Sequence, residues 1–214
     1  MADKKIVEAV DKVKQASQEL DRHFKQTIDI VINLKNIDLN IPKNRVEEDI
    51  ELPKGRGSEA KIALFASGEL ALKSQNVVDF IIKPEEIEEL ASNKKQFKKV
   101  ADSYDFFIAE APLMPTIGKT LGTVLGPRGK MPRPVPPAAD ISNMVSTLRN
   151  TVKVRSKTNT TFHSIVGNQD MASEDIASNI EAIIKRLDGI LERGHMNIRS
   201  IYIKTTMGPA EKIV

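Results

Sequence analysis

The sequence has 214 residues, of which 40% are hydrophobic, and it carries a formal net charge of +3. The absence of cysteine excludes disulfide bonds, cysteine-ligated zinc and thiol nucleophiles, and the few aromatic residues leave Ile, Leu, Val and Ala to form the core. Apolar runs such as residues 28–34 are too short to span a bilayer and the charged N-terminus is unlike a signal peptide, so we expect a soluble intracellular protein without a membrane partner.

The N-terminal region has the pattern of one helix followed by two strands. Apolar residues recur at helical spacing from Lys4 to Leu20. Residues 26–34 alternate between polar and apolar, which places Ile28 and Ile30 on one face of a strand. Residues 45–52 alternate more weakly, and we expect them to pair with the first strand as an antiparallel neighbour.

A segment rich in Gly and Pro, residues 53–58, separates this region from a different pattern. Beyond it, short apolar strands alternate with helices as far as residue 155. Such alternation is typical of a mostly parallel open sheet that helices cover on both faces. We expect strands at residues 62–65, 77–82, 104–109 and 151–155, and helices that begin near residues 68, 84 and 139.

The C-terminal region predicts a strand at residues 161–166, a helix at residues 173–192 and a last long strand that runs through Ile203. Neither end of the chain has enough strands to form a core by itself. We therefore predict a fold that combines α/β and α+β architecture in two domains. Residues 1–57 and 156–214 form an α+β domain, and residues 58–155 form an inserted Rossmann-like parallel α/β domain.

No motif in the sequence indicates an enzyme, and we predict no catalytic residue, cofactor or metal site. The Gly55–Ala60 segment has the letters of a dinucleotide-binding fingerprint but precedes a strand, which is the wrong context. Gly118-Lys119-Thr120 resembles the end of a phosphate-binding loop, yet the first glycine of that motif is missing. The three histidines lack the spacing of metal ligands. A nucleotide-using enzyme built on the inserted domain is kept as an alternative.

Basic residues concentrate in one part of the chain, because residues 111–169 contain eight Lys and Arg but only one acidic residue. Within this stretch, residues 122–134 hold three Gly and three Pro, a composition that predicts a loop of defined shape. Arg128, Lys130 and Arg133 give this loop a positive charge. It is either an arm that contacts phosphate or a rigid loop folded onto its own domain.

The segment from Ile203 to Ala210 ends the last strand with two hydroxyls, a methionine, a glycine and a proline. Thr205 and Thr206 could bind phosphate or a ribose 2′-hydroxyl, and Met207 offers a flexible apolar surface to a base or sugar. A simple strand exit with Met207 in the core explains the same residues, and chemistry alone favours that interpretation.

Two segments together resemble one family, the universal large-subunit ribosomal protein L-one family. They are Gly126-Pro127-Arg128-Gly129-Lys130-Met131-Pro132 and Thr205-Thr206-Met207-Gly208-Pro209. Phe24-Lys25-Gln26-Thr27 before the first strand, the two-part domain and the chain length agree with this resemblance, which covers essentially the whole chain. The basic loop and the short chain are more similar to the archaeal form than to the bacterial one.

The resemblance implies a protein that binds large-subunit rRNA at the mobile stalk near the tRNA exit site and takes part in release of deacylated tRNA. It also implies translational repression through binding of its own mRNA leader, association with the large ribosomal subunit, and a monomer when free. A non-ribosomal RNA-binding protein of the same fold is the alternative. The implied RNA-binding residues are His23, Phe24, Thr27, Thr158, Ser200, Thr205, Thr206, Met207 and Gly208. From its charge, we expect the basic loop with Arg128, Lys130 and Arg133 to make a secondary RNA contact.

The charge of the predicted RNA-binding domain is balanced. Residues 1–57 and 156–214 contain 18 basic and 18 acidic residues, so the +3 excess lies in residues 58–155. Bulk electrostatic attraction is therefore a weak explanation for RNA binding by this domain. We expect local hydrogen bonding to supply the affinity, with a smaller salt dependence than a basic arm gives.

Overall fold

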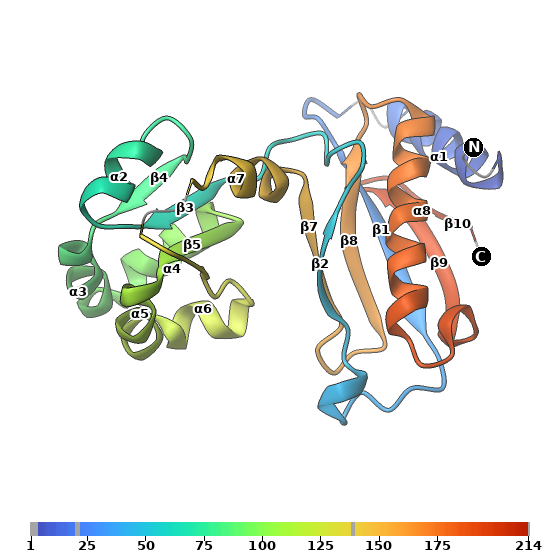
Figure 1. Ribbon diagram of the computed structural model, residues 1–214. Coiled ribbons are helices and arrows are strands. Elements are labelled where there is room, and N and C mark those ends of the chain that lie inside the picture. Colours follow the sequence, from blue (N-terminus) through green and yellow to red (C-terminus); the bar gives the residue numbers. More distant parts are fainter. Residues whose placement is uncertain (1–3, 20–21, 138–139, 214) are drawn as a thin grey trace. The chain divides into compact units, whose positions relative to one another are not determined.

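A computed structural model describes residues 4–19, 22–137 and 140–213. The chain forms two compact units (Figure 1). The first unit consists of residues 1–59 and 150–214, and the second unit consists of residues 60–149. Within the described residues, no helix is long and apolar enough to cross a membrane.

The first unit is built on a four-stranded antiparallel sheet with the strand order β10-β9-β1-β8. Two chain segments that are far apart in sequence, residues 27–34 and residues 198–205, lie side by side in its centre. The strands are β1 (Thr27–Leu34), β8 (Thr161–Asn168), β9 (Ile198–Thr205) and β10 (Ala210–Lys212).

One face of this sheet packs against α1 (Lys4–Gln18) and α8 (Ser173–Ile190). The alternation that predicted β1 has the expected effect, since Ile28, Ile30, Ile32 and Leu34 are all buried in the same core as the apolar residues of both helices. The opposite side, which we call the open face, carries the alternate residues of each strand, and those of β1 are only partly buried.

A separate two-stranded ribbon pairs β2 (Glu47–Glu51) with β7 (Thr151–Arg155). Ion pairs join the two strands, with 3.1 Å between Arg155 Nε and Glu47 Oε1 and 3.5 Å between Lys153 Nζ and Asp49 Oδ1. The expected pairing of β2 with β1 is therefore wrong. Both edges of β1 are already occupied, by β8 and β9, whose buried residues complete its apolar face.

The same ribbon moves one domain boundary. We expected residues 151–155 to belong to the inserted domain, but as β7 they pair with β2 and lie in the first unit. Alternating apolar residues identified this strand, whereas its partner depends on a contact across about a hundred residues of chain. The second crossing between the units consequently lies between Arg149 and Asn150.

The second unit is a parallel sheet with the strand order β4-β3-β5-β6, which confirms the predicted α/β class. Successive residues of β3 enter different cores: Ile62 and Leu64 pack in one, and Ala63 and Phe65 in the other. The strands are β3 (Ile62–Phe65), β4 (Phe80–Ile82), β5 (Phe106–Glu110) and β6 (Arg133–Val135). The helices are α2 (Gly68–Ser74), α3 (Pro84–Ser92), α4 (Lys94–Ser103), α5 (Met114–Thr120), α6 (Gly122–Arg128) and α7 (Ser142–Arg149).

The segment predicted as a loop over residues 122–134 is helical in its first half. Residues 122–128 form α6, with Pro127 near its end, and Gly129 then leaves the helix in the left-handed conformation. The prediction failed because the Gly and Pro content outweighed the helical spacing of Leu121, Val124 and Leu125, all of which are buried.

Candidate nucleic-acid interface

The turn that follows β9 is closed by a hydrogen bond within the segment singled out from the sequence. Thr205 is fully buried, and its Oγ1 accepts a hydrogen bond of 3.0 Å from the backbone N–H of Gly208. A Cβ atom added at Gly208 would lie 2.2 Å from that oxygen. Glycine is therefore required here for space. The Thr205 side chain shapes the turn from inside and does not reach the surface.

A buried glutamine holds the turn from the other side. Gln26 is 1% exposed, and its Oε1 accepts a 2.9 Å hydrogen bond from the backbone N–H of Met207. Its Nε2 donates a 2.7 Å hydrogen bond to Ser17 Oγ near the end of α1. Gln26 thus connects the first helix to the C-terminal turn. We did not predict a role for it, because a glutamine before a strand carries no distinctive signal.

The turn presents hydroxyls and apolar groups together. The Thr206 backbone N–H donates to Thr27 O at 3.1 Å, and the two threonine hydroxyls lie 3.2 Å apart. Met207 is 57% exposed and Phe24 is 46% exposed. The alternative that buries Met207 in the core is therefore wrong. His23 is exposed as well. We call the group formed by His23, Phe24, Thr27, Thr206, Met207 and Gly208 the turn surface.

Two of the predicted residues lie at the other end of the open face. Ser200 pairs with Asn33 across β9 and β1, and its Oγ accepts a 2.9 Å hydrogen bond from Asn33 Nδ2. Thr161 Oγ1 donates to Asn33 Oδ1 at 2.6 Å, so the row continues onto β8. Thr158 is exposed in the connection that precedes β8.

The nine implied residues therefore do not form one cluster. Thr27 and Asn33 are six residues apart on β1, a distance of about 20 Å along an extended strand. One group surrounds Thr27 and the other surrounds Asn33, and both belong to the open face or its ends.

Two basic residues, one next to the turn surface and one in the centre of the open face, lie close to carboxylates. Lys25 Nζ lies 2.8 Å from Asp170 Oδ2. Asp29 on β1 stands directly opposite Lys204 on β9. Partial burial raises the pKa of Asp29, although the positive charges of His163 and Lys204 oppose that shift. This part of the surface has little net charge to offer a polyanion.

Two of the basic residues singled out in residues 122–134, Arg128 and Lys130, bind other residues of the second unit. Arg128 Nε donates to Asp102 Oδ1 at 2.8 Å, and this hydrogen bond is the main reason why the pKa of Asp102 is lowered. Lys130 Nζ donates to Ala101 O at 2.8 Å and to Tyr104 O at 2.7 Å. Arg133 lies on β6 and is partly buried. For Arg128 and Lys130, the geometry fits a segment folded onto its own domain.

Comparison with known proteins identifies the family of this chain. The model of the Ribosomal protein L1p/L10e family matches residues 13–209. The chain belongs to this family. It is 52% identical to the large ribosomal subunit protein uL1 of Methanocella arvoryzae, with the whole of both chains covered. It is 50% identical to the protein of the same name from Thermoplasma volcanium, over 97% of this chain and 95% of the relative.

This result confirms the resemblance inferred from the two sequence segments and its archaeal character. Another similar protein, from Haloquadratum walsbyi, is 49% identical over 95% of this chain and 96% of its own. The matched residues include both segments as well as the residues of the turn surface. The chain is a ribosomal protein.

The crevice where nucleotides bind in open α/β sheets carries an acidic group in this member of the L1p/L10e family. Glu110 at the end of β5 is buried, and its Oε2 accepts hydrogen bonds from the backbone N–H (3.0 Å) and the hydroxyl (2.7 Å) of Ser67, which follows β3. Ligands of such sheets bind outside the carboxyl ends of these central strands. A carboxylate there repels phosphate. Gly118-Lys119-Thr120 lies within α5, where Thr120 Oγ1 donates to Thr116 O. Both observations weigh against a nucleotide-using enzyme.

Proposed function

We propose that this ribosomal protein binds rRNA of the large subunit through the turn surface of its first unit. The observation that carries this proposal is the exposure of Met207 on a turn that Gln26 and Thr205 hold in place and that brings the hydroxyls of Thr27 and Thr206 together. Phe24, in the segment that precedes β1, is exposed as well. RNA helices are recognised through the hydroxyls and base edges of a wide, shallow minor groove. Small polar groups beside exposed apolar side chains suit that recognition.

Membership of the family supports further roles for the same surface. The relatives are named as proteins of the large ribosomal subunit. We propose the same assembly for this chain, as a ribosome-associated cytoplasmic protein at the mobile stalk near the tRNA exit site. Its further roles are release of deacylated tRNA and repression of its own translation, through the mRNA leader. The second group of residues, Thr158 and Ser200, contributes to this RNA contact, and Thr205 contributes through the shape of the turn. Arg128, Lys130 and Arg133 are proposed as secondary contacts that would have to exchange their present partners for RNA.

The test measures the affinity of the full chain for large-subunit rRNA, with Thr206→Ala and Met207→Ala variants. Each lost contact of this type costs about 1–3 kcal/mol, which corresponds to a complex that is about five- to 150-fold weaker. Thr123→Ala and Leu72→Ala are matched controls, because both side chains are exposed on helices of the second unit. Competition between the rRNA and the mRNA leader tests whether both RNAs use one surface.

Unchanged affinity in both turn variants, with an intact fold, would show that RNA binds elsewhere. Footprinting on large-subunit rRNA then locates the bound site directly. Co-sedimentation with large ribosomal subunits separates a ribosomal role from the alternative of a non-ribosomal RNA-binding protein with the same fold.

A further inference from the structure

Three connections meet at the end of the first unit that is farthest along β1 from the turn surface (Figure 1). They are residues 35–46 between β1 and β2, residues 156–160 between β7 and β8, and residues 191–199, which lead from α8 into β9. We call these three segments the loop end. They adjoin the row of Thr161, Asn33 and Ser200 on the open face, because Lys35 and Arg199 are close neighbours of that row in sequence.

The loop end has a positive net charge, although the net charge of the whole first unit is close to zero. It contains six Lys and Arg residues against two acidic residues, a net charge of +4. The first unit as a whole has 20 basic and 19 acidic residues, so its remainder has 14 against 17, a net charge of −3. The basic residues of the loop end are Lys35, Lys43, Arg45, Lys157, Arg193 and Arg199.

Among the residues that the structure describes, most of these cations have no partner. All six side chains are exposed. The guanidinium of Arg45 donates hydrogen bonds to Leu39 O at 2.9 Å and to Asn40 O at 3.2 Å. The other five make no ion pair or side-chain hydrogen bond with a described residue. The neighbouring ribbon behaves differently, since Lys153 and Arg155 pair with carboxylates across the strands.

Hydrogen bonds hold the three connections in fixed positions relative to one another. Asn197 is 2% exposed; its Oδ1 accepts from Arg193 N at 2.8 Å, and its Nδ2 donates to Lys35 O at 3.2 Å. Ser156 is also buried, and its Oγ accepts a 3.0 Å hydrogen bond from Val46 N. The backbones that carry the cations are thus anchored to each other. Such preorganisation lowers the entropic cost of binding an extended anion.

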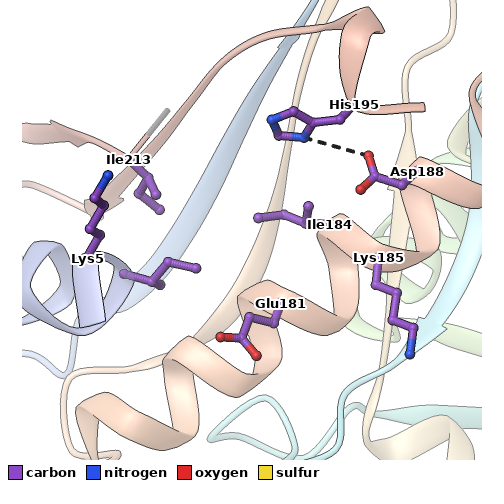
Figure 2. A pocket seen from close by; sticks show the side chains of 8 residues that line it. Lys5, Glu181, Ile184, Lys185, Asp188, His195 and Ile213 are labelled. Carbon is purple, nitrogen blue, oxygen red and sulfur yellow. Dashed lines mark ion pairs between the residues drawn. The ribbon is translucent and has the colours of Figure 1, made fainter. Parts of the chain in front are cut away.

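The helix side of the same unit gives a useful contrast. A cavity of about 670 Å³ lies there among α1, α8 and the C-terminal segment (Figure 2). Its basic residues Lys5 and Lys185 are accompanied by Glu181 and Asp188. His195 of the loop end reaches the rim of this cavity, where its Nδ1 lies 3.8 Å from Asp188 Oδ1. Mixed charges of this kind give no net attraction for a polyanion. At the loop end, by contrast, basic residues outnumber acidic residues by six to two.

We propose that the loop end is a second RNA contact, which binds the phosphate backbone while the turn surface makes the local, shape-dependent contact about 20 Å away on the same face. The inference rests on the proposed function, because it assumes that RNA occupies the open face. The two surfaces have different roles: the turn surface discriminates among RNA sites, and the loop end supplies most of the salt-dependent part of the affinity for RNA.

The test compares the salt dependence of rRNA binding for the full chain and two double variants. Lys43→Gln with Lys157→Gln removes two loop-end charges, and Lys4→Gln with Lys185→Gln removes two exposed charges on the helix side. Each lost phosphate contact lowers the slope of log affinity against log salt by about one. The loop-end variant should therefore lose affinity mainly at low salt, with a deficit that shrinks roughly ten- to twentyfold between 50 and 200 mM salt. The helix-side variant should keep the original slope.

Two results would overturn the inference, and they differ in what else they overturn. If the original chain binds rRNA but both double variants retain its slope, the loop end is not a phosphate contact, while the proposed function stands. If the original chain shows no specific affinity for large-subunit rRNA, the proposed function fails together with the inference. Thr206→Ala supplies the complementary readout, because it should weaken binding by a similar factor at every salt concentration.

Discussion

Substitution of Gly208 by alanine tests whether the C-terminal turn is built as the structure indicates. The new Cβ would lie 2.2 Å from Thr205 Oγ1, so either the threonine must rotate or the turn must open. In both cases the 3.0 Å hydrogen bond from Gly208 N is lost. A buried hydroxyl without a partner costs about 1–3 kcal/mol, and displacement of tightly packed atoms adds about 1 kcal/mol or more. We expect Gly208→Ala to lower the free energy of unfolding by about 2–4 kcal/mol.

A second substitution makes this prediction specific. Thr205→Ala alone removes the same hydrogen bond and should cost about 1–2 kcal/mol, since the residue is fully buried. In the Thr205→Ala, Gly208→Ala double variant, the oxygen that the new Cβ would strike is absent. The double variant should therefore be no less stable than Gly208→Ala, and the two costs should fall short of additivity by about 1–2 kcal/mol.

Urea unfolding followed by circular dichroism measures these differences, and hydrogen exchange of the β1 and β9 amides assigns them to the first unit. Costs that add to within about 0.5 kcal/mol would refute the assigned contact. Affinity for rRNA gives an independent result. A double variant that regains stability but not RNA affinity would show that Gly208 also admits a close approach of the RNA backbone.

Two further predictions concern buried polar groups of the first unit. Burial raises the pKa of Asp29, so ionisation of this carboxyl opposes folding at every pH above the pKa that it has in the unfolded chain. Asp29→Asn should therefore stabilise the protein at neutral pH, and this gain in the free energy of unfolding should disappear as the pH falls below the ordinary carboxyl range. Urea unfolding at a series of pH values measures this dependence. A gain that stays constant with pH would contradict the burial argument. The side chain of Asn179 is fully buried and forms hydrogen bonds of 2.7–3.0 Å with Lys54 N, Gly55 O and Val166 O. Asn179→Ala should therefore lower the free energy of unfolding by about 3 kcal/mol and speed amide hydrogen exchange at residues 54–57 more than elsewhere. An equal change of exchange rates throughout the first unit would argue against a local anchor.

Much of the secondary structure could be predicted because it depends on local patterns. The alternation of residues 28–34 determines which side of β1 is buried, whatever lies beside it. The same rule identified residues 151–155 as a strand. It could not assign them to the first unit, because strand pairing is decided by residues distant in sequence, here Glu47–Glu51. Local composition also misled over residues 122–128, where Gly and Pro lie within a helix that buries Val124 and Leu125.

In the candidate site, too, some features could be predicted from the sequence and others depend on the tertiary structure. Thr206, Met207 and Gly208 were identified from the sequence because their types and order are characteristic of a family, and Met207 is indeed exposed. Their support was not visible in the sequence. Gln26 and Thr205 act through hydrogen bonds that exist only when α1, β1 and the turn are brought together, and neither residue type is unusual by itself.

The distribution of charge shows most clearly what the sequence determines and what the tertiary structure determines. The sequence by itself determined that the first unit is nearly neutral, and this argued against a bulk electrostatic mechanism. Only the tertiary structure decided where the charges lie. It pairs Lys25, Lys153 and Arg155 with carboxylates and, among the described residues, leaves five cations of the loop end unpaired at one end of the sheet. The physical reason is that screening limits electrostatic interactions to about 10 Å, so a polyanion responds to the local arrangement of charges and not to their sum.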